Sequence, residues 1–278
     1  MTLIDGRAIA AAITAEVTET AAKLRESGTA PTLAVLVPTD DDDATAWYVR
    51  SIERAAKKVG VDCRVVQLEN PTGADVTREL DKLSADPSVH GIICQTPLPD
   101  GVTLDDVGAH IDPRKDVDGA NPVSLGRLTA GLPTYAPATA AAVLEILKRE
   151  QVALSGAQVA VVGRSTIVGK PAALLLLGEH ATVTVCHSRT KDLAAVTKTA
   201  DVLVVAVGRA HFIGADHVKP GAVVIDVGTN PTPEGGLVGD VDQAAVEEIA
   251  GSITPVPGGV GPVTTSLLLR HTVTAAQS

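Results

Sequence analysis

The chain has 278 residues and a formal net charge of −10, and it contains one Trp, one Phe and two Tyr. The acidic balance argues against nucleic acid or an anionic membrane as a partner, and the few aromatic rings argue against a base-stacking platform. The length is enough for one large domain or two ordinary ones, and hydrophobic residues, 45% of the chain, can supply a sizeable core.

Neither targeting nor metal binding is indicated by the sequence. No apolar stretch reaches the length of a membrane span, and the first residues lack the basic segment and cleavable apolar core of a signal peptide, so we expect a cytoplasmic protein. The three cysteines fit neither a disulfide framework nor a zinc signature. We therefore expect no metal site.

The N-terminal half alternates helical and strand-like segments. Helical spacing predicts helices over 7–27, 44–59 and 74–85, and short apolar runs predict strands at 32–37, 63–68 and 91–95. The acidic run 40–43 is expected to be a solvated loop, and residues 96–137 are rich in turn-forming Pro and Gly.

The C-terminal half begins with a predicted helix at 138–151 and continues with four apolar, β-branched runs at 157–163, 181–187, 201–207 and 222–228. Such runs are typical of strands buried on both faces of a parallel sheet. The fold class is therefore α/β, with two domains that meet near residue 138 and a last helix, 263–276, that returns to the first domain.

A dinucleotide site is indicated where the strand 157–163 runs into the turn that starts at Gly163, Arg164 and Ser165 and leads to a helix. A helix N-terminus with exposed backbone amides can bind a phosphate, although the spacing is not G-x-G-x-x-G and a tight structural turn is the alternative. The next strand ends in His187, Ser188 and Arg189, where NAD enzymes carry an acid. Two guanidiniums suit a 2′-phosphate, which favours NADP; a solvent-facing Arg189 is the alternative.

Several longer phrases follow one another in a recognisable order. They are GRSTIVGKP, ATVTVCHSRT, KPGAVVIDVG, GDVD and TPVPGGVGPVT in the C-terminal half, with Tyr48-Val49-Arg50, Gln95-Thr96-Pro97-Leu98-Pro99 and Lys115-Asp116-Val117-Asp118-Gly119 before them. Together they resemble the bifunctional methylenetetrahydrofolate dehydrogenase/methenyltetrahydrofolate cyclohydrolase family.

This resemblance implies two α/β domains flanking a cleft, the second a Rossmann-type parallel sheet, and a homodimer. Residues 1–137 would form the folate-binding catalytic domain, with the C-terminal helix 263–278 packing back on it, and residues 138–262 the NADP-binding domain. The implied oxidoreductase of one-carbon metabolism oxidises 5,10-methylenetetrahydrofolate with NADP and then hydrolyses the methenyl product.

The resemblance also implies site residues. Tyr48, Gln95 and Asp118 would bind and process the folate, Asp118 by pairing with the amino-pyrimidinone edge of the pterin. Gly258, Gly259 and Pro262 would shape the loop between cofactor and substrate. The residues expected around the cofactor are Gly163, Arg164, Ser165, Ile167, Val168, His187, Ser188, Arg189, Val207, Gly208, Gly228 and Thr229.

The substrate half departs from the family pattern. Ile52 stands where the family carries its catalytic lysine, four residues after Tyr48 on the same helical face. Further differences are Thr96, Ala120, Asn121, Ser124, Ala140 and Ala142, and aspartates at 40 and 43. Because isoleucine can neither give nor take a proton, we expect an NADP-dependent dehydrogenase whose cyclohydrolase activity is weak or lost.

Two alternatives stay open. One is a repurposed enzyme that transfers the methylene carbon of the folate to another small-molecule nucleophile. The other is a non-catalytic protein that binds folate or NADP.

Overall fold

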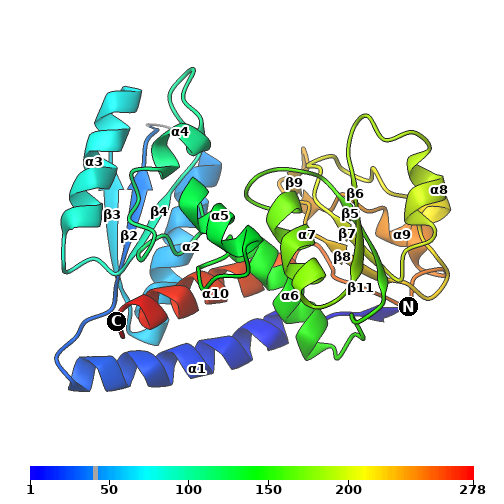
Figure 1. Ribbon diagram of the computed structural model, residues 1–278, viewed down its shortest axis with the longest axis horizontal. Coiled ribbons are helices and arrows are strands. Elements are labelled where there is room, and N and C mark those ends of the chain that lie inside the picture. Colours follow the sequence, from blue (N-terminus) through cyan, green and yellow to red (C-terminus); the bar gives the residue numbers. More distant parts are fainter. Residues whose placement is uncertain (40–42) are drawn as a thin grey trace. The chain divides into compact units, whose positions relative to one another are not determined.

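The computed structural model describes residues 1–39 and 43–278 and divides into two compact units (Figure 1). One unit comprises residues 11–138 and 265–278 and is called here the three-strand unit; the other comprises residues 1–10 and 139–264 and is called the six-strand unit. Positions 40–42 of the acidic run, for which a solvated loop is expected, lie outside the described residues.

The three-strand unit is built on a parallel sheet with the order β3 (Asp62–Gln67), β2 (Thr32–Val37) and β4 (Gly91–Cys94). β2 lies in the centre, and its residues 33–37 are buried. Val76, Leu80 and Leu83 of α3 (Gly73–Ala85) pack in one cluster with Ala34 and Leu36 of that strand. The apolar run at 32–37 thus forms the sheet interior, whereas the edge strand β3 is partly exposed.

The remaining helices of this unit are α2 (Asp43–Val59), the part of α1 (Gly6–Glu26) from Ala11 onward, and the part of α10 (Val260–Ala275) from Thr265 onward. The turn-rich stretch contains two short helices, α4 (Leu104–Gly108) and α5 (Pro122–Thr129). Thr103 and Asp106 form a capping box at α4, and Asn121 caps α5 with Pro122 in the first turn. These caps satisfy the amides at the start of each helix, which stabilises even short ones.

The six-strand unit holds a sheet with the order β1 (Thr2–Leu3), β11 (Ser252–Ile253), β8 (Val223–Asp226), β7 (Val202–Val205), β5 (Gln158–Val162) and β6 (Thr182–Cys186). Every neighbouring pair is parallel. Its helices are α6 (Ala138–Arg149), α7 (Gly169–Gly178), α8 (Leu193–Thr197) and α9 (Gln243–Val246), with a 3-10 turn at Ala215–His217 and a small hairpin of β9 (Asn230–Pro231) and β10 (Leu237–Val238). Two α/β units with parallel sheets confirm the predicted fold class.

The division of the chain differs from the expected boundaries at the N-terminus. Residues 1–10 cluster with the six-strand unit because Thr2 and Leu3 pair with Ser252 and Ile253. The start of α1 also lies tightly against Gly259, since a Cβ at Gly6 would overlap the Gly259 carbonyl. A two-residue strand carries no periodicity of its own, so the sequence pattern did not indicate it.

Within the described ranges, no helix is long and apolar enough to cross a bilayer. Over the same residues, no group of three or more His, Cys, Asp or Glu side chains is arranged to hold a metal ion. The cytoplasmic location stays a prediction.

Candidate functional site

Three predicted substrate residues lie around the carboxyl end of the three-stranded sheet. Gln95 directly follows β4, where its amide donates to the Leu36 carbonyl at 2.9 Å. The Thr45 hydroxyl donates to the Thr96 carbonyl at 3.0 Å, which holds the first turn of α2 beside this loop. Tyr48 lies one turn further along α2 and is partly buried. The structure therefore brings Tyr48 and Gln95 to the same edge.

Asp118 reaches the same edge along a segment that runs beside β4. Ile92 forms a parallel bridge with Asp116, and the Ile92 amide donates to the Lys115 carbonyl at 2.8 Å. The pKa of the Tyr48 hydroxyl is raised, first by burial and then by the negative charge of Asp118, so the two side chains interact electrostatically. The three residues thus form one candidate site in the three-strand unit.

The Asp118 carboxyl is held in a fixed turn. Its Oδ1 accepts a hydrogen bond from the Ala138 amide at 3.1 Å. Gly119 has φ +62°, and a Cβ there would lie 2.5 Å from the Pro137 nitrogen, so this close approach requires glycine. Burial raises the pKa of Asp118 to about 7; the Ala138 amide opposes this shift, and the charge of Asp116 adds to it. The carboxyl therefore titrates near neutral pH.

The loop that carries Asp118 is anchored by a second, structural carboxylate. Asp116 has no exposed surface and accepts hydrogen bonds from the amides of Ala120 and Asn121 and, at 2.5 Å, from the Ser124 hydroxyl. Burial raises the pKa of Asp116, and these three donors act in the opposite direction. Ser124 is itself 1% exposed. Asn121 and Ser124, which the family pattern groups with the substrate side, serve here to hold the loop.

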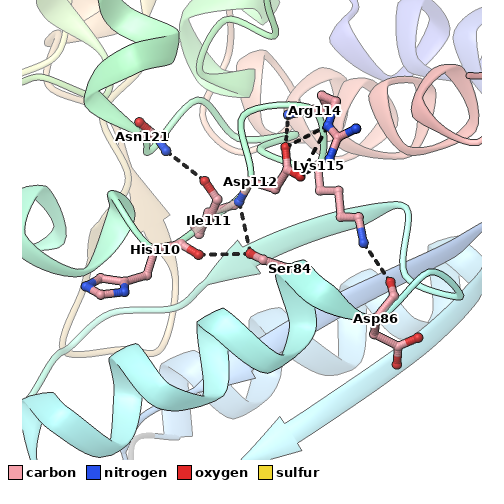
Figure 2. Close-up of polar contacts among 8 residues, drawn as sticks. All are labelled: Ser84, Asp86, His110, Ile111, Asp112, Arg114, Lys115 and Asn121. Atoms are coloured by element: carbon pink, nitrogen blue, oxygen red, sulfur yellow. Dashed lines mark hydrogen bonds and ion pairs between the residues drawn. The ribbon is translucent and has the colours of Figure 1, made fainter.

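Figure 2 shows how the preceding part of this loop is fastened to the body of the unit. Asn121 donates from Nδ2 to the Ile111 carbonyl at 2.7 Å. The Ser84 hydroxyl donates to the His110 carbonyl and accepts from the Asp112 amide, both at 2.9 Å. Lys115 donates from Nζ to the Asp86 carbonyl at 2.6 Å. These bonds between side chains and backbone fix the loop before it reaches Asp118.

Ile52, where the resemblance implies the family's lysine, has no exposed surface. It lies one turn after Tyr48 on α2, and residues four apart share a helix face. The five lysines of this unit all lie in the described ranges. Lys57 and Lys58 are exposed in the last turn of α2, and the others donate to acceptors elsewhere: Lys23 to Glu19, Lys82 to Glu79 and Lys115 to Asp86. None of these contacts places a lysine ammonium at Ile52.

The arginines beside Ile52 do not replace it either. Arg50 and Arg54 are both exposed, and Arg54 donates from Nε to the Arg50 carbonyl at 3.1 Å. Positions two apart on a helix face different directions, and a guanidinium does not deprotonate in proteins. The Ile52 position of this unit is therefore apolar.

The candidate dinucleotide turn lies in the six-strand unit, where the chain order reverses. β5 has β6 on one side and β7 on the other, which is the switch point at which open α/β sheets bind ligands. Gly163 has φ +128°, and a Cβ there would overlap the Ala206 carbonyl; a Cβ at Gly169 would overlap the Gly163 carbonyl. The close approach of backbone to backbone at these two positions requires glycine, as in the turn of a dinucleotide-binding site.

The amides at the start of α7 have internal partners. Ser165 accepts at Oγ from the amides of Val168 at 3.1 Å and Gly169 at 3.3 Å, and its carbonyl accepts from the Lys170 amide at 3.0 Å. These three amides therefore have partners within the turn, and the binding of a phosphate at this helix N-terminus stays a prediction. The Ser165 hydroxyl proton and the exposed side chain of Arg164 can still donate hydrogen bonds to an anion. Ile167, also expected near the cofactor, is 41% exposed.

The turn after β6 is shaped by His187. Its Nδ1 accepts from the Arg189 amide at 3.1 Å, and its amide donates to the Thr190 hydroxyl at 2.9 Å. Ser188 and Arg189 are left exposed. Val162 pairs in register with Cys186, so the turns after the two strands begin at the same level of the sheet. Arg164 and Arg189 therefore emerge from neighbouring strand ends.

The loops after β7 and β8 share one carboxylate that the sequence analysis did not identify. Asp240 has no exposed surface and accepts hydrogen bonds from the amides of Val207 at 2.6 Å, Gly208 at 2.9 Å and Arg209 at 2.8 Å, and from Asn230 Nδ2 at 2.9 Å. The GDVD phrase contained this residue but gave no sign of its partners.

Asp226 completes this part of the unit. It accepts from the amides of Gly228, Asp240 and Val241, and burial raises its pKa to about 6 while these amides act in the opposite direction. Together the two carboxylates fix Val207, Gly208 and Gly228 at the carboxyl edge of the sheet, where a cofactor is expected, and Thr229 directly follows Gly228.

The glycine loop before α10 belongs to the six-strand unit. Gly259 is buried against Gly6, and a Cβ at Gly258 would lie 3.3 Å from Arg7 Nε. Pro262 lies in the first turn of α10. The role expected of Gly258, Gly259 and Pro262 toward the substrate stays a prediction.

Two family models match the chain. The model described as tetrahydrofolate dehydrogenase/cyclohydrolase, catalytic domain, matches residues 4–118, and the NAD(P)-binding domain of the same family matches residues 137–278. The chain belongs to the tetrahydrofolate dehydrogenase/cyclohydrolase family. This confirms the recognised family, the Rossmann-type dinucleotide domain, and the class of enzyme: methylenetetrahydrofolate dehydrogenase-like, with a nicotinamide dinucleotide cofactor and a tetrahydrofolate derivative as substrate.

Curated relatives and solved structures agree with this family. The bifunctional protein FolD of Parafrankia sp. is 63% identical over 99% of both chains, and FolD 1 of Saccharopolyspora erythraea is 60% identical over 98% of this chain and 93% of its own. The FolD crystal structure from Campylobacter jejuni is 41% identical with a TM-score of 0.96, covering 100% of this chain and 99% of that one. The Trypanosoma brucei family member, solved with NADP and an inhibitor, is 39% identical with a TM-score of 0.93, covering 100% and 97%.

Proposed function

We propose that this family member oxidises 5,10-methylenetetrahydrofolate to 5,10-methenyltetrahydrofolate with NADP and hydrolyses the product weakly or not at all. The observation that carries the proposal is the fully buried Ile52 beside Tyr48, in a unit whose lysines are all engaged or exposed elsewhere. In contrast, the turn after β5 has its glycines and Arg164, and the turn after β6 has Arg189.

Substrate binding is assigned to the edge where Tyr48, Gln95 and Asp118 meet. As a carboxylate, Asp118 can accept two N–H bonds from the amino-pyrimidinone edge of a pterin. Its Oδ1 already accepts the Ala138 amide, which leaves Oδ2 and further lone pairs of the carboxylate for these donors. The half-buried ring of Tyr48 offers an apolar wall for the folate.

The choice of NADP over NAD is supported by the chemistry of the two turns. Arg164 and Arg189 are exposed at neighbouring strand ends, together with the hydroxyls of Ser165 and Ser188. This donor set fits a 2′-phosphate, and no carboxylate closes β6 to hold a free 2′-hydroxyl. When bound, the cofactor supplies the hydride acceptor; the residues of the chain bind and orient it.

Hydrolysis is expected to fail because it needs proton transfer to and from water. General acid–base help typically contributes roughly a hundred- to ten-thousandfold to such a step. Ile52 provides none and makes the site less favourable for water. Oxidation produces a cation, which an ammonium would oppose, so loss of the lysine need not slow hydride loss electrostatically.

The test uses the purified chain with methylenetetrahydrofolate and NADP, following NADPH and the methenyl product separately by absorbance. Accumulation of methenyl product in step with NADPH supports the proposal. Hydrolysis of added methenyltetrahydrofolate at a rate typical of the family would contradict the loss of the second step. Folate binding without NADPH formation would favour transfer of the one-carbon unit to another nucleophile, and absence of both activities would favour a binding protein.

We also propose that the chain forms a homodimer through the open edge of the six-stranded sheet. β6 is the edge strand, with Val185 40% exposed, and Leu177 on the neighbouring α7 is 59% exposed. An apolar strand edge of this kind favours pairing with a second copy. Light scattering of the wild type and of Leu177→Glu is the test; a wild-type monomer at micromolar concentration would rule the dimer out.

A further inference from the structure

We infer that His271 is a positioning residue for the folate-binding carboxylate of Asp118. The inference rests on the proposed function, in which Asp118 binds the pterin edge. His271 lies on the part of α10 that belongs to the three-strand unit, and no part of the proposed chemistry uses it.

The ring of His271 has a defined protonation state and direction. Its Nδ1 lies 2.8 Å from the Val117 carbonyl oxygen, and a carbonyl can only accept, so Nδ1 carries the hydrogen. Burial lowers the pKa of His271 to about 4; the bond to Val117 opposes this shift, and the charge of Arg270 adds to it. The ring is therefore a neutral donor at physiological pH.

The donor bond reaches the residue directly before Asp118. Val117 has no exposed surface, and a Cβ at Gly91 would lie 3.0 Å from its Cγ1 and 2.7 Å from the Thr272 hydroxyl. β4, α10 and the Asp118 loop therefore pack closely at this point. A bond from His271 to the Val117 carbonyl sets the orientation of the peptide unit that leads into Asp118.

His271 also touches the second segment that holds Asp118. The rings of His271 and Tyr135 lie 5.1 Å apart between centroids, with an angle of 38° between their planes. Three residues after Tyr135, the Ala138 amide donates to Asp118 Oδ1. The side chain of His271 thus contacts both segments that orient the Asp118 carboxylate. It reaches the first at Val117 by a hydrogen bond and the second at Tyr135 by ring packing.

A donor that orients the Asp118 loop should affect folate binding more than hydride transfer. Removing a single hydrogen bond of this kind is expected to raise the KM for methylenetetrahydrofolate roughly threefold to tenfold. Both kcat and the KM for NADP should stay within about twofold, because the cofactor residues lie in the other unit. An amide at the same place can donate as the imidazole does, so asparagine should preserve the function.

The experiment compares the full-length wild type with His271→Asn, which keeps a donor, and His271→Leu, which keeps apolar bulk without one. Thr274→Ala is the matched control on the same helix, since the Thr274 hydroxyl is exposed and donates only to the Arg270 carbonyl of its own helix. NADPH formation gives kcat and both KM values for each variant, and thermal unfolding reports the fold.

A raised folate KM in the leucine variant alone supports the inference. It is overturned if the leucine variant keeps the wild-type folate KM, if asparagine is as impaired as leucine, or if the KM for NADP rises in parallel. If leucine gives no folded protein, His271→Ala is assayed with and without added imidazole; rescue supports the inference, and a folded variant without rescue overturns it. A wild type that neither binds nor oxidises the folate removes the proposed function and this inference with it.

Discussion

Replacing Ile52 by lysine (Ile52→Lys) is expected to restore hydrolysis of the methenyl product. Ile52 lies one turn after Tyr48 on α2 and has no exposed surface, so an amine introduced there starts from the helix face that carries Tyr48. General acid–base assistance of roughly a hundred- to ten-thousandfold corresponds to about 3–5 kcal/mol of activation free energy. We expect the hydrolysis rate to rise at least about a hundredfold.

The same substitution has a cost in stability that can be anticipated. It removes the packing of a fully buried isoleucine and places an amine in a poorly solvated site, which costs roughly 1–3 kcal/mol of unfolding free energy. Burial lowers the pKa of a lysine, so part of the amine would be neutral and able to accept a proton near pH 7. Since any remaining ammonium opposes the methenyl cation, the rate of NADPH formation is expected not to increase.

The assay separates the two steps and uses Ile52→Met as the matched control. Methionine is unbranched and flexible as lysine is, but it carries no amine, so it reproduces the loss of isoleucine packing alone. Decay of added methenyltetrahydrofolate is measured without NADP, and thermal unfolding verifies the fold of each variant. The reasoning is refuted if a folded Ile52→Lys protein that still binds folate hydrolyses the methenyl compound no faster than Ile52→Met.

Four further predictions concern Asp118, Asp240 and Arg189. The folate-binding form of Asp118 is the carboxylate, and the pKa of Asp118 is about 7. The folate KM should therefore rise roughly tenfold per pH unit below about pH 7 and level off above about pH 8. Initial rates measured across this pH range test the prediction, and a flat profile contradicts it. Because the pKa of Asp118 is raised, the folded state keeps a proton on this carboxyl between about pH 4 and 7 that the unfolded state has lost. Asp118 therefore lowers the free energy of unfolding as the pH rises through that window. At about pH 8, Asp118→Asn should unfold at a higher temperature than wild type while losing folate binding. Asp240→Asn should raise the NADP Kd roughly tenfold or more in calorimetry, because the amide nitrogen that replaces one carboxylate oxygen cannot accept the hydrogen bonds made to that oxygen. An unchanged Kd would count against this positioning role. Arg189→Ala should lower the ratio of kcat/KM for NADP over NAD roughly tenfold, and an unchanged ratio would place the 2′-phosphate elsewhere.

The larger elements were predictable because their signals are local. The strand over 32–37 has the bounds of β2, and the helix predicted over 44–59 begins one residue earlier in the structure. Each of these segments shows its period within its own residues. β1 and β11 have two residues each and exist through pairing between Thr2 and Ser252, which are distant in the chain, so no local pattern indicates them.

The short helices α4 and α5 were missed for a different reason. Thr103 with Asp106 and Asn121 with Pro122 are recognisable helix starts, but the abundance of Pro and Gly around them favoured turns. Helices of this length depend on their caps and on tertiary packing more than on periodicity.

Among the site residues, those whose side chains would meet a ligand were identified through the family phrases, while those that act on backbone groups were not. Asp240 and His271 each bond to main-chain atoms of segments that are remote in sequence, and such partners appear only when the chain is folded. Asp116 bonds to the amides of Ala120 and Asn121, which follow it closely in the chain, but nothing in the sequence pattern singles out this turn. The internal partners of the Val168 and Gly169 amides were likewise invisible, because Ser165 could equally have been expected to turn toward an anion.

The two steps of the family reaction depend on different kinds of residue, which explains how one can fail alone. Oxidation needs the folate and the cofactor to be held in position, and under the proposed function that task falls to Asp118 and to backbone loops fixed by buried carboxylates. Hydrolysis needs in addition a group that moves a proton, and a single side chain carries that requirement. Under the proposed function, isoleucine in place of lysine at position 52 removes the second step without disturbing the hydrogen bonds on which the first depends, and the ratio of methenyl to formyl product measures that separation directly.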